Sequence, residues 1–371
     1  MKKVLGIVFS NMHEHTVSEL TANRCMGSIP VGGRYRLIDF ALSSMVNSGM
    51  EKVGVITKSN YQSLMDHLGN GREWDLSRKN GGLVILPPFG SGESGMYRGR
   101  VEAFAGIMRY IKSTGCQYVL SADCDTMANI DYRRFRDAHI ESGADITVMY
   151  KKMSILEGGG KDQCTFVTDD DGFVREMFIN PEAPGAQNVY LNIMIADREL
   201  LEHAVSAAYS RSQFSFEKDV LQAGVGSYKI HAYEFDGYVA RFNSMRSYYQ
   251  ANMAFLQPEV REALFPMGRP IYTKVRDEAP VRYGLKNKVS NSMLADGCLI
   301  EGEVENSILF RGVTVSKGAK VKNCVLMQGT QVGEGSNLDY VITDKDVTVK
   351  DNRMIMGFET YPVYIAKGSA V

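Results

Sequence analysis

The chain has 371 residues, which is enough for two domains of ordinary size and excludes a single small domain. Its 42 Lys and Arg residues are balanced by 43 Asp and Glu residues, giving a formal net charge of −1. This balance excludes the basic footprint with which proteins bind nucleic acid or an anionic membrane surface. The 6 cysteines are scattered without C-x-x-C spacing, so we expect reduced thiols and neither a zinc knuckle nor a secreted disulfide framework.

The first apolar run, residues 4–9, follows two lysines but is too short for the core of a signal peptide. It meets polar residues without a small-residue cleavage site, and we predict a buried strand there. No run reaches the roughly 18 apolar residues that a membrane span needs. We therefore expect a soluble protein of the cytoplasm.

Up to about residue 255, short apolar runs alternate with segments of helical period. Strands are expected at 4–9, 53–57, 118–120 and 146–150, and helices at 40–47, 101–112 and 132–142. This alternation predicts an α/β fold with a Rossmann-like, mostly parallel sheet covered by helices on both faces. Ligands of such a domain are expected beyond the carboxyl ends of its strands.

Residues 257–288 contain four prolines and have the composition of a linker. Beyond them, aliphatic residues recur every 17 positions in three series: Val304, Val321 and Leu338; Ile308, Val325 and Ile342; Val315, Val332 and Val349. A period of about 18, built from six-residue units, is typical of a left-handed parallel β-helix. The predicted organisation is an α/β domain at 1–256, a linker at 257–288 and a β-helix at 289–371 that acts as scaffold and oligomerisation module.

Two polar motifs of the first domain suggest anion or metal chemistry. Asp123 and Asp125 follow a predicted strand, where carboxylates can hold Mg²⁺ against a diphosphate, although turn and cap chemistry explains such clusters equally often. Residues 32–36 place two arginines beside a glycine turn, a pattern that could bind an anion. A solvent-exposed turn without a ligand explains the pattern equally well.

The loop after the first strand is unlike a phosphate cradle. It has no glycine between Ile7 and Gly27, so backbone N–H groups cannot approach a triphosphate closely, and Glu14 adds repulsion. His13 and His15 are candidate metal ligands, but loop histidines without a partner cluster are more often solvated.

Long motifs at 32–43 (GGRYRLIDFALS) and 296–307 (DGCLIEGEVENS), with further matches at 97–99 and 248–252, resemble bacterial glucose-1-phosphate adenylyltransferase, also called ADP-glucose pyrophosphorylase. The resemblance covers nearly the whole chain. It implies a nucleotidyltransferase domain followed by a left-handed β-helix, a tetrameric assembly, and a role in glycogen or starch synthesis.

The family's catalytic positions are changed in this chain. Its G-G-x-G-T-R-L loop reads here as residues 11–17 without a glycine, and Met26 stands where a lysine contacts phosphate. Asp123 keeps the first metal position, but Arg241 stands at the second and is expected to place positive charge beside Asp123. The resemblance leaves a relic substrate pocket formed by Tyr97, Arg98, Gly99, Asn180 and Lys218.

The pattern resembles the D-type, regulatory subunit of this family. It implies a chain inactive by itself, without a cofactor of its own, that forms a hetero-oligomer, expected to be a tetramer, with a catalytic ADP-glucose pyrophosphorylase subunit in which Mg²⁺ acts. Partners of the nucleic-acid or membrane kind are not expected. Arg24 and Arg36 match positions that line an anionic activator site between the two domains, where Asn23 and Pro30 replace other members.

Two alternatives stay open. The chain is an active glucose-1-phosphate adenylyltransferase if Asp123 holds Mg²⁺ and Arg241 or Lys218 supplies the missing charge. A third hypothesis is a sensor that binds a sugar phosphate or a nucleotide in the relic pocket without turnover.

Overall fold

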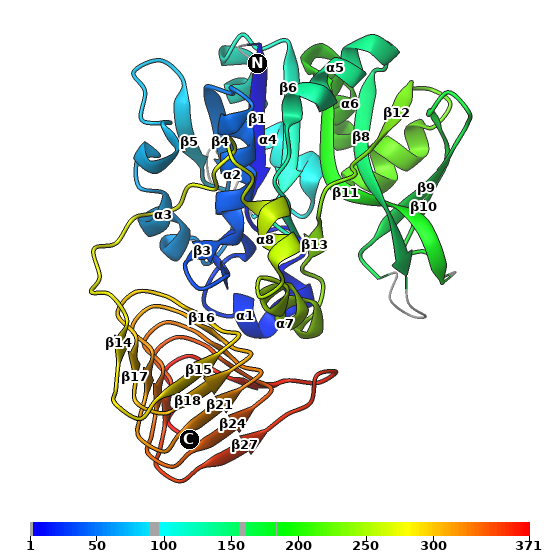
Figure 1. Ribbon diagram of the computed structural model, residues 1–371. Coiled ribbons are helices and arrows are strands. Elements are labelled where there is room, and N and C mark those ends of the chain that lie inside the picture. The colour runs from blue at the N-terminus through cyan, green and yellow to red at the C-terminus, as the bar shows by residue number, and fades with distance from the viewer. Residues whose placement is uncertain (1–2, 89–95, 156–160, 183) are drawn as a thin grey trace.

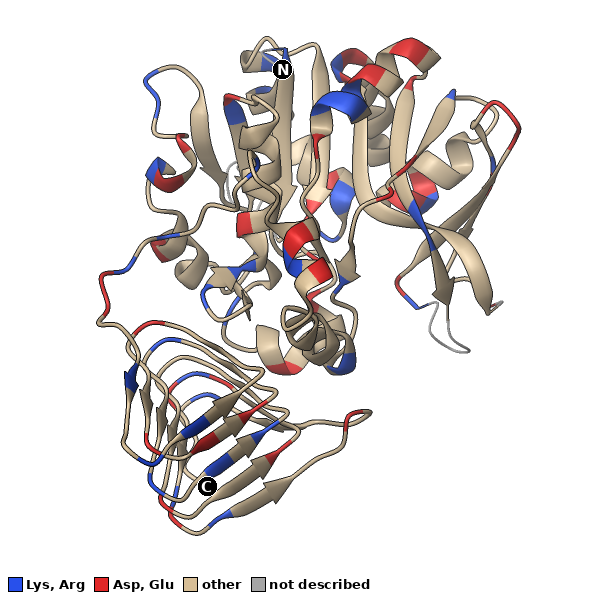
Figure 2. Cartoon of the chain, viewed as in Figure 1, with Lys and Arg blue, Asp and Glu red and all other residues tan. Residues whose placement is uncertain are grey.

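A computed structural model describes residues 3–88, 96–155, 161–182 and 184–371. The chain forms an α/β domain followed by a triangular stack of short strands, and both lie against each other at the lower edge of the α/β domain (Figure 1). Figure 2 shows acidic and basic residues interspersed over both domains, as the balanced composition predicts. Within the described ranges, no helix combines the length and the apolar character that a membrane crossing requires.

The α/β domain is built on a nine-stranded sheet with the path β10-β9-β11-β6-β1-β4-β5; off this path, β8 pairs with β11 and β12 pairs with β8. Its strands are β1 (Val4–Phe9), β4 (Lys52–Ile56), β5 (Gly82–Leu86), β6 (Tyr118–Asp123), β8 (Ile146–Ile155), β9 (Cys164–Thr168), β10 (Val174–Ile179), β11 (Gly185–Asp197) and β12 (Ile230–Glu234). The strands β5, β4, β1 and β6 are parallel, which confirms the Rossmann-like prediction, whereas β11 runs antiparallel to β6.

The central strand β1 is buried throughout because both faces of the sheet are covered. Val4 and Val8 belong to one apolar cluster, and Leu5, Ile7 and Phe9 belong to the other, as the two-residue period of a strand requires.

Helices divide between these two clusters. The first face is covered by α2 (Leu37–Asn47) and α5 (Tyr132–Ser142), and the second by α4 (Arg100–Ser113) and α6 (Arg198–Ser210). The shorter helices are α1 (Ser18–Thr21), α3 (Gln62–Leu68), α7 (Met245–Ala254) and α8 (Pro258–Leu264). Two small antiparallel pairs complete the domain, β2 (Pro30–Val31) with β3 (Tyr35–Arg36) and β7 (Thr126–Met127) with β13 (Ala240–Arg241).

The segment predicted as a linker is only partly a linker. Helix α8 lies within it, because Pro258 at the first helical position favours a helix start and Val260 and Leu264 pack into the core of the α/β domain. The structure records neither helix nor strand at 265–281. The first coil then begins earlier than predicted, with β14 (Arg282–Tyr283) and β15 (Lys288–Ser290).

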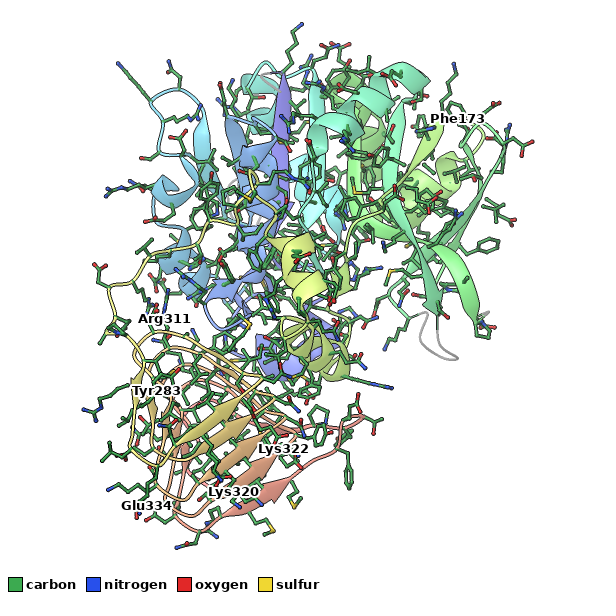
Figure 3. All side chains as sticks on the ribbon, in the orientation of Figure 1. Phe173, Tyr283, Arg311, Lys320, Lys322 and Glu334 are labelled. Atoms are coloured by element: carbon green, nitrogen blue, oxygen red, sulfur yellow. The ribbon has the colours of Figure 1, made fainter. Side chains whose placement is uncertain are left out.

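The C-terminal domain is a left-handed parallel β-helix of three five-stranded sheets. The sheets comprise β14, β17 (Leu299–Ile300), β20 (Thr314–Val315), β23 (Gln331–Val332) and β26 (Thr348–Val349); β15, β18 (Glu303–Glu305), β21 (Lys320–Lys322), β24 (Asn337–Asp339) and β27 (Met354–Met356); and β16 (Met293–Leu294), β19 (Ile308–Leu309), β22 (Val325–Leu326), β25 (Val341–Thr343) and β28 (Val363–Ile365). Figure 3 labels Lys320 and Lys322, which flank the inward Val321 of β21.

The predicted 17-residue series is the register of these sheets. Val315 pairs with Val332 and Val332 with Val349, and the other two series stack in the same way. Each series is buried, so the period arises from aliphatic side chains that fill the interior of successive coils.

The two domains share a buried junction. The guanidinium Nη2 of Arg24 donates to both carboxylate oxygens of Asp344 at 2.7 and 2.9 Å, and both side chains are at most 3% exposed. The hydroxyl of Tyr364 donates to Asp344 and also lies 3.0 Å from the carbonyl oxygen of Glu19. These contacts connect the last coil of the β-helix to the first helix of the chain.

Candidate functional site

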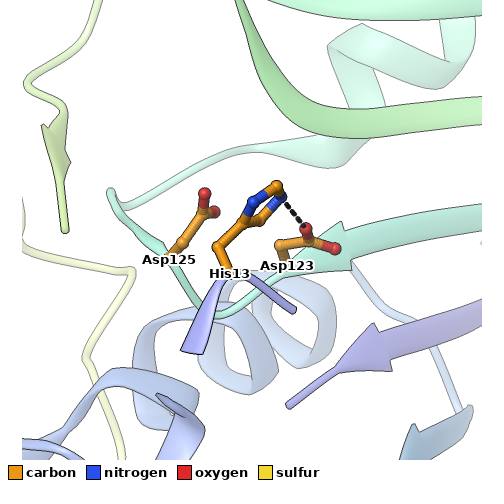
Figure 4. Close-up of side chains that lie close together, drawn as sticks. All are labelled: His13, Asp123 and Asp125. Atoms are coloured by element: carbon orange, nitrogen blue, oxygen red, sulfur yellow. Dashed lines mark ion pairs between the residues drawn. The ribbon is translucent and has the colours of Figure 1, made fainter. Parts of the chain in front are cut away.

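The candidate site lies where β1 and β6 end, at the edge predicted to hold ligands. Asp123 is the last residue of β6, Asp125 follows two residues later, and His13 lies in the loop after β1 (Figure 4). The three side chains converge from segments far apart in the sequence because parallel strands end at the same edge of the sheet.

Asp123 is paired with an arginine that the sequence did not single out. Arg100, the first residue of α4, places Nη1 and Nη2 at 2.8 and 2.7 Å from the two carboxylate oxygens of Asp123. Its Nε lies 2.8 Å from Glu217, and its guanidinium carbon lies 4.6 Å from the ring centroid of Phe9. Arg100 is 2% exposed, so this is a fully buried, two-pronged ion pair.

Asp125 is paired with a second arginine. Arg241 on β13 places Nη2 at 3.0 Å from Asp125 and donates from Nη1 to the carbonyl oxygen of Tyr190 at 3.1 Å. The amide of Asn192 donates to the same Asp125 oxygen at 2.9 Å. The expectation that Arg241 stands beside Asp123 is therefore wrong: the antiparallel pairing of β13 with β7 directs Arg241 to Asp125, and Arg100 takes the place beside Asp123.

The pKa values of the two carboxylates shift in opposite directions in the presence of these partners. Burial raises the pKa of Asp123 to about 6, against the opposing effect of Arg100. Burial acts in the same direction on Asp125, but Arg241 and His13 outweigh it and lower the pKa of Asp125. Both carboxylates are therefore ionised at pH 7, and two guanidinium groups neutralise them from within the protein.

A magnesium ion does not fit the residues present. The nearest candidate atoms of His13, Asp123 and Asp125 lie within 4.8 Å of one another, with His13 Nε2 at 3.6 Å from Asp123. However, each of the four carboxylate oxygens already accepts a hydrogen bond, from Arg100, Arg241 and Asn192 or from the hydroxyl of Thr126. Mg²⁺ demands near-octahedral oxygen ligands, and here the oxygens and their charge are taken by arginines.

The loop after β1 carries buried side chains in place of glycines. Met26, at the position where the resemblance predicts a lysine, is completely buried in the apolar cluster that also contains α2. Asn11 accepts a 2.6 Å hydrogen bond from the hydroxyl of Tyr97. Burial raises the pKa of Glu14 to about 7, and one of its carboxylate oxygens is buried with no hydrogen-bond partner in the described structure.

Residues of the predicted relic pocket do not converge. Tyr97 reaches the loop after β1, but Arg98 points away, with its guanidinium 3.6 Å from the ring centroid of Phe214, and Lys218 is exposed. Gly99 is required structurally, because a Cβ there would lie 2.2 Å from the carbonyl oxygen of Phe214. Asn180 accepts a hydrogen bond from the backbone of Asp162 rather than lining the paired carboxylates.

A cavity of about 780 Å³ opens beside the arginine-paired site. Of the residues that the sequence analysis considered for substrate or metal, its described lining includes His15 and Arg241. His15 lies on its rim and places Nε2 at 2.9 Å from Asp162, whereas His13 points toward the carboxylates, so the two histidines do not form one metal site.

A second, smaller pocket of about 40 Å³ lies between the domains and is strongly basic. Six of its lining residues carry positive charge and none carries negative charge: Arg34, Arg36, Lys274, Arg276, Arg311 and Lys345. Burial, together with Arg36 and Arg24, lowers the pKa of Lys345 to about 8. Neighbouring cations of one sign in a buried setting favour a bound anion.

Of the two predicted effector residues, Arg24 and Arg36, one lines this pocket and the other does not. Arg36 lines it, donating from Nη1 to the hydroxyl of Ser63 at 3.0 Å, whereas Arg24 is committed to Asp344. Arg311 is 8% exposed, its Nε and Nη2 donate no hydrogen bond to a described residue, and the nearest carboxylate, that of Asp296, is 3.6 Å away. Arg311 is thus the cation of this pocket best placed to receive an anion.

Comparison with known proteins identifies the family. Residues 16–238 match the nucleotidyl transferase family, and residues 279–360 match the GlmU-like, C-terminal hexapeptide family. The glycogen biosynthesis protein GlgD of Bacillus subtilis is 35% identical over 367 residues, which cover 99% of this chain and 96% of that protein. Glucose-1-phosphate adenylyltransferases of Bacillus mycoides and Bacillus cereus are 32% and 31% identical over 362 residues, 95% of both chains in each comparison. The chain belongs to the glucose-1-phosphate adenylyltransferase family.

In this member of the glucose-1-phosphate adenylyltransferase family, the strand ends carry the buried ion pairs Arg100–Asp123 and Arg241–Asp125. Arg100 could have been noticed in the sequence, because it puts a cation at the second position of residues 99–103, where the resemblance expects G-T-A-D-A without a cation. Arg311 and Lys345 carry no such signal, since they lie at coil corners whose place beside the α/β domain depends on how the two domains pack.

Proposed function

We propose that this chain is a regulatory, largely non-catalytic subunit of ADP-glucose pyrophosphorylase in cytoplasmic glycogen biosynthesis. In this role it enhances a catalytic partner that makes ADP-glucose from ATP and glucose 1-phosphate. The names of its relatives support the pathway, and the buried pairs Arg100–Asp123 and Arg241–Asp125 carry the non-catalytic assignment.

The physical argument concerns charge. Nucleotidyl transfer needs cations free to neutralise a triphosphate, and the protein's share of catalysis is mainly positioning and electrostatics. In this chain the cations nearest the strand ends are already neutralised by Asp123, Asp125 and Glu217. Loss of one positioned electrostatic group costs about 2.7–4 kcal/mol of transition-state stabilisation, and here the lysine at Met26 is missing as well.

Assembly with a catalytic chain is the second part of the proposal. The complex is a hetero-oligomer, expected to be a tetramer, and Mg²⁺ acts in the catalytic partner. The basic pocket between the domains is the proposed effector site, with Arg36 and Arg311 facing the anion. Arg24 contributes indirectly, since Asp344 holds it and the same contact positions Lys345.

The test is pyrophosphate-dependent breakdown of ADP-glucose with Mg²⁺, by this chain alone, by the catalytic partner alone and by the mixture. The proposal expects no turnover by this chain and a faster rate for the mixture than for the partner alone. A mixture that behaves as the partner alone contradicts the regulatory role.

The closeness of His13, Asp123 and Asp125 favours one alternative, an active adenylyltransferase that uses Asp123 and Mg²⁺ after Arg100 moves away. That alternative expects solo turnover that is saturable in ATP and abolished by Asp123→Asn. A sensor without turnover would instead show calorimetric binding of ATP, ADP-glucose or a sugar phosphate to this chain alone.

A further inference from the structure

One face of the β-helix carries an ordered pattern of charges. On the sheet of β15, β18, β21, β24 and β27, the middle residue of each strand points inward and its two neighbours point outward. We call these outward residues the ladder face; strand by strand they are Lys288 and Ser290, Glu303 and Glu305, Lys320 and Lys322, Asn337 and Asp339, and Met354 and Met356. Figure 3 labels Lys320 and Lys322 on this face.

The charges of the ladder face reverse sign about the line between β18 and β21. Two glutamates on β18 oppose two lysines on β21. On the outer strands Lys288 is in register with Asn337, and Ser290 is in register with Asp339. Residues of opposite charge thus lie at equal distances on the two sides of this line. When a second copy is rotated by 180° about the line, each charged residue of β18 or β21 meets a residue of opposite charge.

We propose that the ladder face binds a second copy of this chain about a two-fold axis that lies parallel to the strands between β18 and β21. In this arrangement Glu303 and Glu305 of each copy face Lys320 and Lys322 of the other, while Lys288 and Ser290 face the polar Asn337 and Asp339. The proposal goes beyond the regulatory role and does not depend on it, since it uses only the charges of this chain.

The charges also select this axis over its alternative. A half-turn about an axis across the strands would set glutamate against glutamate and lysine against lysine, which is repulsive. Ion pairs within one chain leave these charges available to a partner. Lys322 lies 3.5 Å from Glu305 and Lys288 lies 3.8 Å from Glu303, at exposed positions where such ion pairs contribute little to stability. Within the described ranges Lys320 has no ion pair.

The area of the face requires a further contact. Five strands of three residues span only about 240 Å², given the usual strand spacing and rise. A stable interface buries about 800 Å² per partner. Beyond the ladder face, which ends at Met354 (71%) and Met356 (56%), the exposed Phe358 (74%) and Tyr361 (81%) of the turn after the last coil supply further contact.

The proposed rotation gives these apolar side chains a place. It carries β27 past β15 of the other copy, toward the end of the β-helix nearest the α/β domain (Figure 1). A groove of about 560 Å³ runs between α7 and the coil corners, from Asn291, next to β15, to Glu359 in the turn after the last coil, and Met253 and Leu256 are among its lining residues. A polar ladder with one apolar end has the composition expected of a specific, self-complementary interface.

The experiment measures the mass of the full chain by sedimentation over a range of concentrations. Wild type should dimerise, and Glu303→Lys/Glu305→Lys or Lys320→Glu/Lys322→Glu should each weaken the dimer at least tenfold. An equimolar mixture of the two variants should dimerise again, because an all-lysine face then meets an all-glutamate face. Phe358→Ser/Tyr361→Ser should weaken the dimer without any charge change.

The matched control is Lys317→Glu/Lys350→Glu, which makes the same charge change at exposed positions outside the ladder face and should leave the dimer intact. Circular dichroism checks that each variant is folded. A wild-type chain that stays monomeric, a control that weakens the dimer as much, or a mixture that fails to dimerise overturns the proposal. None of these readouts involves activity, so the regulatory role is judged separately.

Discussion

The strand ends of the α/β domain and the pocket between the domains both gather arginines, but they differ in how the positive charge is balanced. At the strand ends Arg100 and Arg241 meet Asp123, Asp125 and Glu217, and every carboxylate oxygen of the two aspartates has a donor. In the pocket between the domains six cations line a space without an acidic residue.

The difference shows that the number of arginines at a site says little about ligand binding. A guanidinium group attracts an anion only when no internal carboxylate has neutralised it, and a buried ion pair gains little by exchanging its partner. The same residue type is therefore neutralised by carboxylates at the strand ends and left without an acidic neighbour in the lining of the interdomain pocket.

The largest expected effect comes from removing the buried arginine that pairs with Asp123. Arg100→Met should lower the free energy of unfolding by about 3–5 kcal/mol, because it leaves Asp123 and Glu217 buried without their cation. Urea denaturation at pH 7 measures the change. Adding Asp123→Asn should recover part of the loss, since the double variant no longer buries that charge.

The matched control for Arg100→Met is Arg98→Met, two residues earlier. Its side chain is 65% exposed and pairs with Glu102, so the change should be about 0–1 kcal/mol. Equal losses in the two variants would mean that Arg100 and Asp123 are not the buried pair described.

The basic pocket between the domains should bind anions and thereby stabilise the chain. At ten times its dissociation constant, inorganic phosphate or sulfate should stabilise the chain by about 1.4 kcal/mol, measured by denaturation against chloride at equal ionic strength. Arg311→Gln should remove most of this gain, and Arg353→Gln, at an exposed position outside the pocket, should not. A gain that survives Arg311→Gln would place the anion elsewhere.

A smaller effect is expected from Glu14. Burial raises its pKa in the folded chain to about 7, above the unfolded value, so its contribution to stability is complete below about pH 4.5 and is lost as the pH rises through 7. Glu14→Gln should therefore raise the free energy of unfolding at pH 8 by about 1 kcal/mol, after allowance for the partial exposure of this side chain. At pH 4.5 the variant and wild type should be alike, and a gain of the same size at both pH values would exclude titration of Glu14 as the cause.

The smallest expected effect is that of magnesium. Because the oxygens of Asp123 and Asp125 already accept hydrogen bonds, millimolar Mg²⁺ should not change the melting temperature of this chain more than Ca²⁺ or matched NaCl does. Isothermal titration with MgCl₂ provides an independent measurement. Specific Mg²⁺ binding that is lost in Asp123→Asn would show that Arg100 yields its place to a metal.

The fold could be predicted well from the sequence, because positions that are buried at regular intervals are occupied by apolar residues. The 17-residue series at Val304, Ile308 and Val315 gave the register of the β-helix, and the apolar run at 4–9 gave the central strand. The charged pairs were harder, since pairing depends on side-chain direction. Nothing local shows that Arg241 faces Asp125 while Arg100 faces Asp123, or that Arg24 is held by Asp344.

The bond from the hydroxyl of Tyr364 to the carbonyl oxygen of Glu19 joins residues 345 positions apart. During synthesis the ribosome releases residue 19 long before residue 364 exists, so α1 must wait for the last coil before it gains this contact. Domains usually fold in order of synthesis, but here the first helix and the arginine that follows it are completed last. A ribosome stalled within the final coil would hold an α/β domain whose N-terminal loop is still open to proteases and chaperones.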